Sequence, residues 1–233
     1  MDEQFILNIK GLRLESVAGN VIVDNVDLQL RKGEVLGLIG KSGAGKSTIG
    51  LSSMVYARAG LHIAGGEVVL GGVNIRALDT EGRRQMRGKR IAYIAQSAAA
   101  AFNPAHSLMD QVCEAPVLHK LMTRPEAEVW ACELFTALDL PDPQNFGKRY
   151  PHQVSGGQLQ RAMAAMAMSC RPDVLVLDEP TTALDVTTQK EILRLIADLQ
   201  REQGSAVLFI THDMGVVAEI ADEVLVMNQG QAV

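Results

Sequence analysis

The chain has 233 residues, of which 22 are Lys or Arg and 27 are Asp or Glu, so its formal net charge is −5. This acidic balance argues against a surface that coats nucleic acid, and we expect no nucleic-acid partner. The three cysteines lack the CxxC spacing of a metal site, which suits reduced thiols in a cytoplasm. The sequence contains no apolar run of about 18 residues and no signal-peptide pattern, so we expect neither a membrane span nor a signal peptide.

The first part of the chain has the pattern of short strands. Val26, Leu28 and Leu30 alternate with polar residues, and the apolar run 35–39 follows after a turn. A glycine-rich stretch then leads into a predicted helix. We expect this helix at about 46–57 and further strands at 67–70 and 91–94.

Helical patterns dominate from residue 97 to residue 168, and apolar strands return afterwards. Buried strands that alternate with helices predict a mostly parallel sheet, so the fold class is α/β, with an antiparallel β portion at the N-terminus. We expect the later strands at 174–177, 206–210 and 224–227. Helices are expected at 108–119, 125–138 and 155–169. A further helix is indicated by the apolar stripe of Ile192, Leu195, Ile196 and Leu199.

Residues 40–48, GKSGAGKST, fit the pattern G-x-x-x-x-G-K-[ST] between a predicted strand and a predicted helix. Glycines let backbone N–H groups surround phosphate oxygens, Lys46 would reach the β and γ phosphates of ATP, and the Ser47 hydroxyl would bind Mg²⁺. The alternative is a glycine-rich turn before an ordinary helix, which would match by chance in roughly one chain of this length in a hundred. The expected phosphate-binding residues are Gly40, Ser42, Gly43, Ala44, Gly45, Lys46, Ser47 and Thr48.

Two carboxylates follow the apolar strand 174–177 directly. In open α/β sheets, ligands collect at the carboxyl ends of the strands. Asp178 would therefore hold Mg²⁺, and Glu179 would polarise a water that attacks the γ phosphate. Alternatively, Asp178 caps the next segment and Glu179 is solvated surface. The phosphate-loop pattern upstream favours the catalytic interpretation.

A second candidate phosphate contact lies at Ser155, Gly156, Gly157 and Gln158, where a helix is predicted to begin. Ser155 and Gln158 form a capping-box pattern, which by itself explains these residues structurally. The two glycines expose helix-start N–H groups and favour an anion contact in addition.

These motifs, taken in order, resemble those of the ABC transporter ATPases, and the resemblance covers residues from about 5 to 233. It implies a P-loop NTPase (RecA-like) core at 1–96 and 169–233, with an inserted α-helical signature subdomain at 97–168. The matching motifs are GKSGAGKST, Gln96 after a strand, VSGGQ at 154–158, VLVLDEP at 174–180, Ala183-Leu184-Asp185 and Thr211-His212-Asp213.

The resemblance also implies that two nucleotide-binding domains pair head to tail. Each ATP would then lie between the Lys46 loop of one domain and the Ser155 segment of the other. Gln96 would contact Mg²⁺ or the attacking water, His212 would act at the γ phosphate, and Asp185 would communicate across the pair. Taken singly, these three residues could instead be a polar strand end, a turn residue and a helix cap.

Segments 102–104, 150–153 and 211–227 look like the branch that powers bacterial uptake of peptides, nickel and related small solutes. This implies permease subunits, a solute-binding receptor and a place at the cytoplasmic face of the inner membrane. Those ATPases usually continue beyond the point where this chain ends, so we expect a C-terminal truncation. The rivals are a soluble ABC ATPase acting in nucleic-acid repair or translation, and a nucleotide-binding regulator that does not turn over.

The family usually stacks an aromatic side chain of the early strands on adenine, but no Phe, Tyr or Trp lies between Phe5 and Tyr56. Ser16 or Val17 stands at that place. We therefore expect poor discrimination between ATP and GTP.

Overall fold

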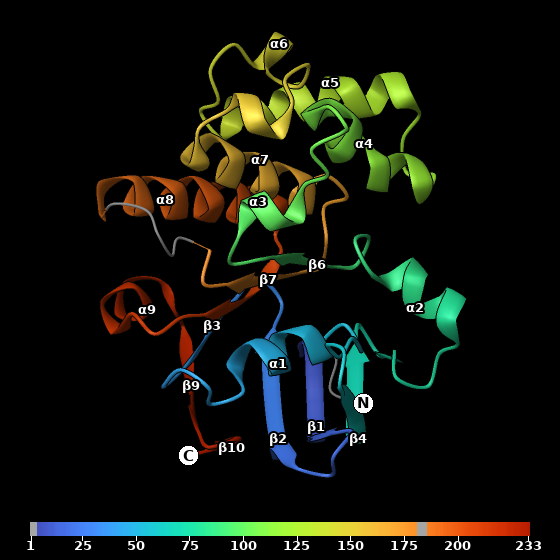
Figure 1. Ribbon diagram of the computed structural model, residues 1–233, viewed down its shortest axis with the longest axis vertical. Coiled ribbons are helices and arrows are strands. Elements are labelled where there is room, and N and C mark those ends of the chain that lie inside the picture. Colours follow the sequence, from blue (N-terminus) through green and yellow to red (C-terminus); the bar gives the residue numbers. More distant parts are fainter. Residues whose placement is uncertain (1–3, 181–185) are drawn as a thin grey trace.

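The computed structural model describes residues 4–180 and 186–233, whose strands form two sheets (Figure 1). The N-terminal sheet is antiparallel, and the second sheet is parallel except at β10. The first sheet has the order β2 (Val21–Arg31), β1 (Phe5–Ser16), β4 (Leu61–Leu70) and β5 (Val73–Asn74). The second has the order β10 (Gln231–Ala232), β9 (Glu223–Asn228), β3 (Val35–Gly40), β8 (Ala206–Ile210), β7 (Val174–Asp178) and β6 (Ile91–Ile94).

Helix α1 (Lys46–Ser52) lies between the two sheets in Figure 1. The alternation predicted at Val26, Leu28 and Leu30 is confirmed, because all three side chains are buried in this layer. They share one core with the buried face of the parallel sheet, which includes Val176 and Ile210. The mixed parallel and antiparallel architecture predicted from the sequence is confirmed.

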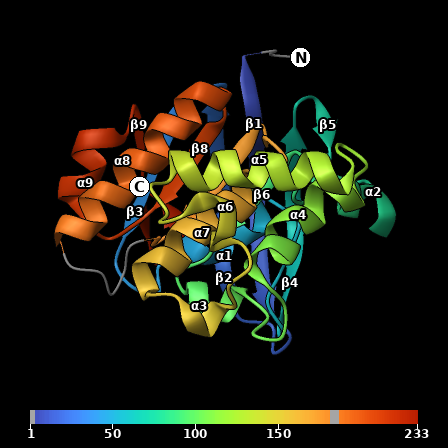
Figure 2. The ribbon, with the colours of Figure 1, turned by 90° about the horizontal axis from the view of Figure 1, so that it is seen from above.

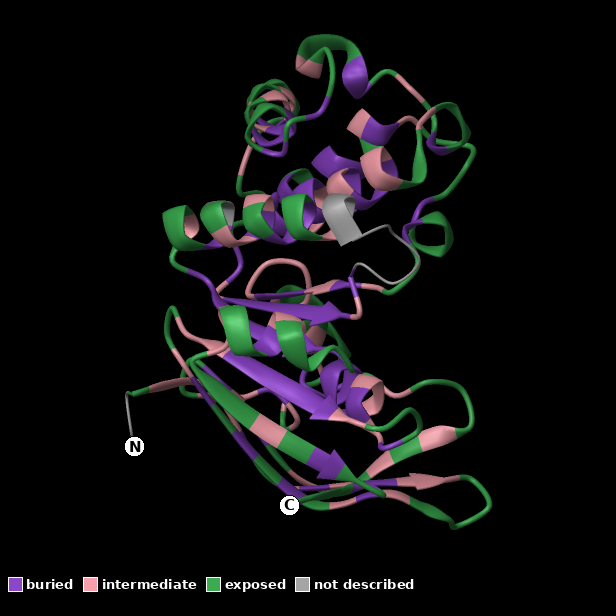
Figure 3. Ribbon diagram, turned by 90° about the vertical axis from the view of Figure 1, so that its left-hand side faces the viewer, coloured by how far each residue is buried: buried purple, intermediate pink, exposed green. Residues whose placement is uncertain are grey.

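The remaining helices complete the fold, and most of them belong to the other side of the parallel sheet. Leu175 and Leu177 of β7 point into this second core, since successive side chains of a strand face opposite ways. Figure 2 shows α5 lying across the molecule above α7, and Figure 3 shows buried residues concentrated in the central strands. The helices here are α3 (Ala98–Ala101), α4 (Leu108–Leu118), α5 (Arg124–Ala137), α6 (Pro143–Phe146), the 3-10 turn η1 (Pro151–Gln153), α7 (Gly156–Met168) and α8 (Val186–Gln203). Two further helices, α2 (Thr80–Met86) and α9 (Met214–Ile220), lie at the margins of the sheets.

Helix α1 is shorter than the predicted 46–57, because it ends at Ser52. Ser52 Oγ donates to Thr48 O at 2.8 Å, and Ser53 Oγ donates to Gly50 O at 2.6 Å. Serine hydroxyls that bond to nearby backbone carbonyls favour helix ends. Val55 then adopts a left-handed conformation with φ of 52°, which stops the helix from continuing. The predicted strand 67–70 is the second half of β4, which pairs with β1 as far as Ser16.

In the described part of the chain, none of the helices combines the length and apolar character that crossing a bilayer requires.

Candidate active site

The loop between β3 and α1 is built on glycines in the left-handed region of φ. Gly40, Gly43 and Gly45 have φ of 152°, 81° and 97°, values that other residues rarely adopt. A Cβ on Gly40, the last residue of β3, would also lie 2.3 Å from Met227 O, because Gly40 pairs with Met227 of β9. Glycine at position 40 is therefore required both by conformation and by packing.

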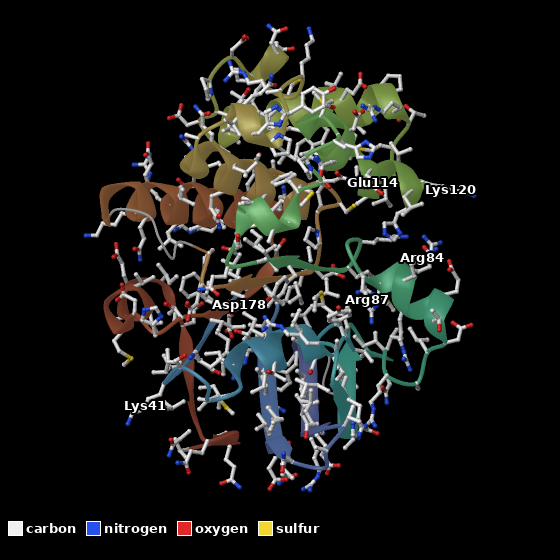
Figure 4. All side chains as sticks on the ribbon, in the orientation of Figure 1. Lys41, Arg84, Arg87, Glu114, Lys120 and Asp178 are labelled. Carbon is white, nitrogen blue, oxygen red and sulfur yellow. The ribbon has the colours of Figure 1, made fainter. Side chains whose placement is uncertain are left out.

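Lys46 turns its ammonium group back along this loop. Its Nζ donates to Gly40 O at 2.8 Å and to Lys41 O at 3.1 Å, and the residue is only 6% exposed. These two carbonyls belong to the residues that begin the loop, so the ammonium group and the loop backbone are held together. Figure 4 shows Lys41 itself projecting at the outer edge of the molecule.

Asp178 ends the buried strand β7 and faces the start of α1 (Figure 4). It is only 3% exposed, and Ser47 Oγ donates to its Oδ1 at 2.8 Å. The Tyr93 hydroxyl donates to its other carboxylate oxygen, Oδ2. Burial, together with the nearby Asp178 carboxylate, raises the pKa of Tyr93 well above its usual value, and Arg58 opposes this shift. Tyr93 therefore stays a hydroxyl donor.

The residues around Asp178 fit a magnesium ion. A buried carboxylate whose hydrogen bonds come from neutral hydroxyls gains from a bound cation, and Mg²⁺ prefers carboxylate and hydroxyl oxygens. Within residues 4–180 and 186–233, no group of three or more His, Cys, Asp or Glu side chains could hold a metal unaided. A magnesium ion at Asp178 and Ser47 would thus need further ligands such as phosphate oxygens or water.

Glu179 connects three segments of the chain. Its Oε2 accepts from Gln96 Nε2 at 3.2 Å, and its Oε1 lies 3.1 Å from His212 Nδ1. Its own N–H donates to Ile210 O at 2.9 Å, which prolongs the pairing of β7 with β8. The left-handed conformation of Glu179, with φ of 47°, is unusual for a residue other than glycine and turns the chain sharply after Asp178.

The side chain of His212 is 65% exposed, while that of Glu179 is 20% exposed. The next residue, Asp213, accepts from Gly215 N and Val216 N and so begins α9. The strand ends of β6, β7 and β8 thus bring Gln96, Glu179 and His212 to one edge of the sheet, beside Asp178.

The Ser155 segment has a different position. It begins α7, where Gln158 N donates to Ser155 Oγ at 3.3 Å and Ser155 N donates to Gln158 Oε1 at 3.1 Å. This is the predicted capping box. Ser155 and Gly156 are exposed, and a Cβ on Gly156 would meet nothing within 4 Å. The segment is open to contacts from outside the chain.

Asp185, which was predicted to communicate across a pair of domains, lies outside the described residues.

Two residues with roles at this edge were missed by sequence reasoning. Tyr93 contacts Asp178 from the neighbouring strand, and Gln160 of α7 donates from its side-chain amide to Pro180 O, next to Glu179. The signal for Tyr93 was its polar hydroxyl in the strand that precedes Gln96. Gln160 was detectable only as a polar residue on the apolar side of a predicted helix.

Comparison with known proteins assigns a family to this arrangement. The family model described as "ABC transporter" matches residues 23–182. The glutathione import ATP-binding protein GsiA of Salmonella typhimurium is 43% identical over all of this chain, which spans 39% of that relative's length. A putative peptide import ATP-binding protein of Brucella melitensis is also 43% identical, and the chain spans 72% of its length.

Solved structures show the same fold. The ATP-binding cassette MJ0796, in a dimeric post-hydrolysis state bound to ADP and Pi, superposes with a TM-score of 0.84 at 25% identity. The alignment covers 97% of this chain and 96% of that one. The structure of cbiO1 from Clostridium perfringens has a TM-score of 0.82 at 24% identity and covers 99% of this chain and 87% of its own.

Proposed function

Because this chain belongs to the ABC transporter family, we propose that it binds and hydrolyses ATP and thereby powers solute uptake across the bacterial inner membrane. The observation that carries the proposal is the position of Glu179, held between Gln96 and His212 beside the Asp178–Ser47 pair of the phosphate loop. Peptides or related small solutes are the proposed cargo, since the relatives are named for glutathione and peptide import. Those names also favour transport over a role in repair or translation.

In this proposal the phosphate loop, 40–48, surrounds the triphosphate with backbone N–H groups, and Lys46 leaves its loop carbonyls to reach the β and γ phosphates. Ser47 and Asp178 hold Mg²⁺, with Gln96 as a further ligand or a contact to the attacking water. When bound, Mg²⁺ neutralises charge on the phosphate oxygens. Glu179 orients the water and takes up its proton, and His212 contacts the γ phosphate.

A second cassette would complete the site. The Ser155 segment is exposed and makes its capping bonds within its own helix start, so its free face suits a nucleotide held by a partner copy or a related subunit. The neighbour MJ0796 was solved as a dimer. We propose head-to-tail pairing, with Asp185 at the contact, and attachment to permease subunits and a solute-binding receptor at the cytoplasmic membrane face.

The test compares the parent chain with Glu179→Gln and with the matched control Glu67→Gln, an exposed residue of β4. We expect Glu179→Gln to lower the rate of phosphate release by about 10²- to 10⁴-fold while ATP binding is kept. The same variant should accumulate an ATP-dependent dimer, measured by light scattering. If Glu179→Gln hydrolyses ATP like the parent and forms no such dimer, the assignment of the base is wrong.

A further inference from the structure

Tyr93 reaches Asp178 from the strand beside it. In the parallel pair of β6 and β7, Tyr93 lies opposite Val176, two residues before Asp178. Val176 and Asp178 point to the same face of the sheet, since side chains alternate along a strand. Two residues of strand cover about 6.6 Å, a distance that a phenol ring can bridge. The Tyr93 ring therefore runs along the sheet toward its carboxyl edge and ends at Asp178 Oδ2.

Helix α1 packs against one side of this ring. A Cβ on Gly50 would lie 2.5 Å from Ile210 Cδ1, 3.2 Å from Val176 Cγ1 and 3.8 Å from Tyr93 Cε2. The helix consequently packs onto the sheet with little space between them, and one edge of the half-buried Tyr93 ring lies against it. This packing on one side and the hydrogen bond to Asp178 at the hydroxyl hold the ring in its place along the sheet.

The two oxygens of Asp178 accept hydrogen bonds from two different elements. Ser47, on α1, donates to Oδ1, and Tyr93, on β6, donates to Oδ2. Of these two donors, Ser47 belongs to the phosphate loop and is itself a proposed magnesium ligand, so its hydroxyl would also have a role at the metal. Tyr93, which also lies near Arg58, is not itself a metal ligand in the proposed mechanism.

We propose that Tyr93 is a positioning residue for the magnesium site, where its hydroxyl fixes the carboxylate plane of Asp178. This inference rests on the proposed function, in which Asp178 holds Mg²⁺. Donors behind a metal ligand orient that ligand, and their loss typically weakens metal affinity by about 10- to 100-fold. Phenylalanine at position 93 would fill the same space without donating, so Tyr93→Phe isolates the hydroxyl.

The experiment measures Mn²⁺ binding, by electron paramagnetic resonance, to the full chain with a non-hydrolysable ATP analogue. The variants are Tyr93→Phe, Asp178→Asn, both together, and the control Tyr56→Phe, a half-exposed tyrosine that packs under Arg87. Analogue binding in EDTA and the melting temperature are measured in parallel. We expect Tyr93→Phe to weaken Mn²⁺ binding by about 10-fold or more while binding in EDTA is unchanged. The double variant should be no weaker than Asp178→Asn alone, because Tyr93 acts through Asp178.

The inference is overturned if Tyr93→Phe binds Mn²⁺ like the parent and like Tyr56→Phe. It is also overturned if binding falls equally with and without metal, which would indicate a merely structural role, or if the effects of Tyr93→Phe and Asp178→Asn add. Failure of the proposed function has a different signature, because the parent itself would then show no metal-dependent binding of the analogue.

Discussion

His212 Nδ1 lies 3.1 Å from Glu179 Oε1, although 33 residues separate them along the chain. The contact exists because β7 and β8 are neighbours whose carboxyl ends meet, with Asp178 paired to Ile210. In the proposed mechanism, Glu179 acts on the attacking water and His212 contacts the γ phosphate, so the two side chains have to be neighbours.

We predict that His212→Ala lowers kcat for ATP hydrolysis by about 10²-fold and leaves KM little changed. The reason is that the Lys46 loop, which binds the phosphates in our proposal, does not depend on His212. Steady-state phosphate release over a range of ATP concentrations measures both constants. His106→Ala, at an exposed histidine, serves as the control and should behave like the parent. A higher KM with unchanged kcat would instead assign His212 to ground-state binding.

Two glycines of the phosphate loop form a matched pair for stability. Both have positive φ, but a Cβ at Gly40 would lie 2.3 Å from Met227 O, whereas a Cβ at Gly43 would meet nothing within 4 Å. We expect Gly43→Ala to cost about 1–2 kcal/mol of unfolding free energy from conformation alone. Gly40→Ala should cost about 1–3 kcal/mol more, because the loop must also move away from β9. Urea unfolding checks this, and equal losses in the two variants would contradict it.

The phosphate loop and the acidic strand end could be predicted from sequence because each is continuous in the chain. Lys46 and Ser47 stand within one nine-residue motif, and Asp178 and Glu179 follow directly on a buried strand. Their order along the chain, together with the rule that ligands collect at strand carboxyl ends, was enough to expect them close together. The hydrogen bond between Ser47 and Asp178 agrees with that expectation.

Contacts that depend on strand order could not be predicted in the same way. Tyr93 meets Asp178 only because β6 pairs with β7 in a register that places Tyr93 opposite Val176. An apolar strand does not reveal its neighbour or its register until the sheet is assembled. The end of α1 at Ser52 escaped prediction for a different reason, since serine hydroxyls there bond to the backbone and override the helical pattern.

The base preference of the site depends on what faces adenine. Val17, one of the two residues that stand where the family's aromatic is expected, is 81% exposed just after β1. We predict that the parent binds ATP and GTP with similar affinity, because no ring there stacks on the base. Val17→Phe should tighten ATP binding by about 1–3 kcal/mol, the worth of one stacked base. Titrations with both nucleotides measure this, and Val129→Phe, at an exposed valine of α5, is the control. A strong preference of the parent for ATP would contradict the prediction.

Gln160 links the helix that begins at Ser155 to the segment that carries Glu179. It is 6% exposed, and its side-chain amide donates to Pro180 O, the carbonyl that follows Glu179. The bond crosses from α7 to the carboxyl end of β7, so a shift of α7 would pull on the segment that carries Glu179. In our proposal, Ser155 contacts the nucleotide of a partner cassette, and Gln160 therefore lies between that contact and the base.

We predict that Gln160→Ala costs about 1–3 kcal/mol of unfolding free energy, because the buried Pro180 carbonyl loses its donor. The rate of ATP hydrolysis should fall more than the affinity for ATP, since the phosphate loop is untouched while Glu179 loses a support of its backbone. Urea unfolding, ATP titration and phosphate release separate the three quantities, with Gln231→Ala on exposed β10 as the control. If hydrolysis and binding decline by the same factor, Gln160 supports the fold generally and carries no link to Glu179.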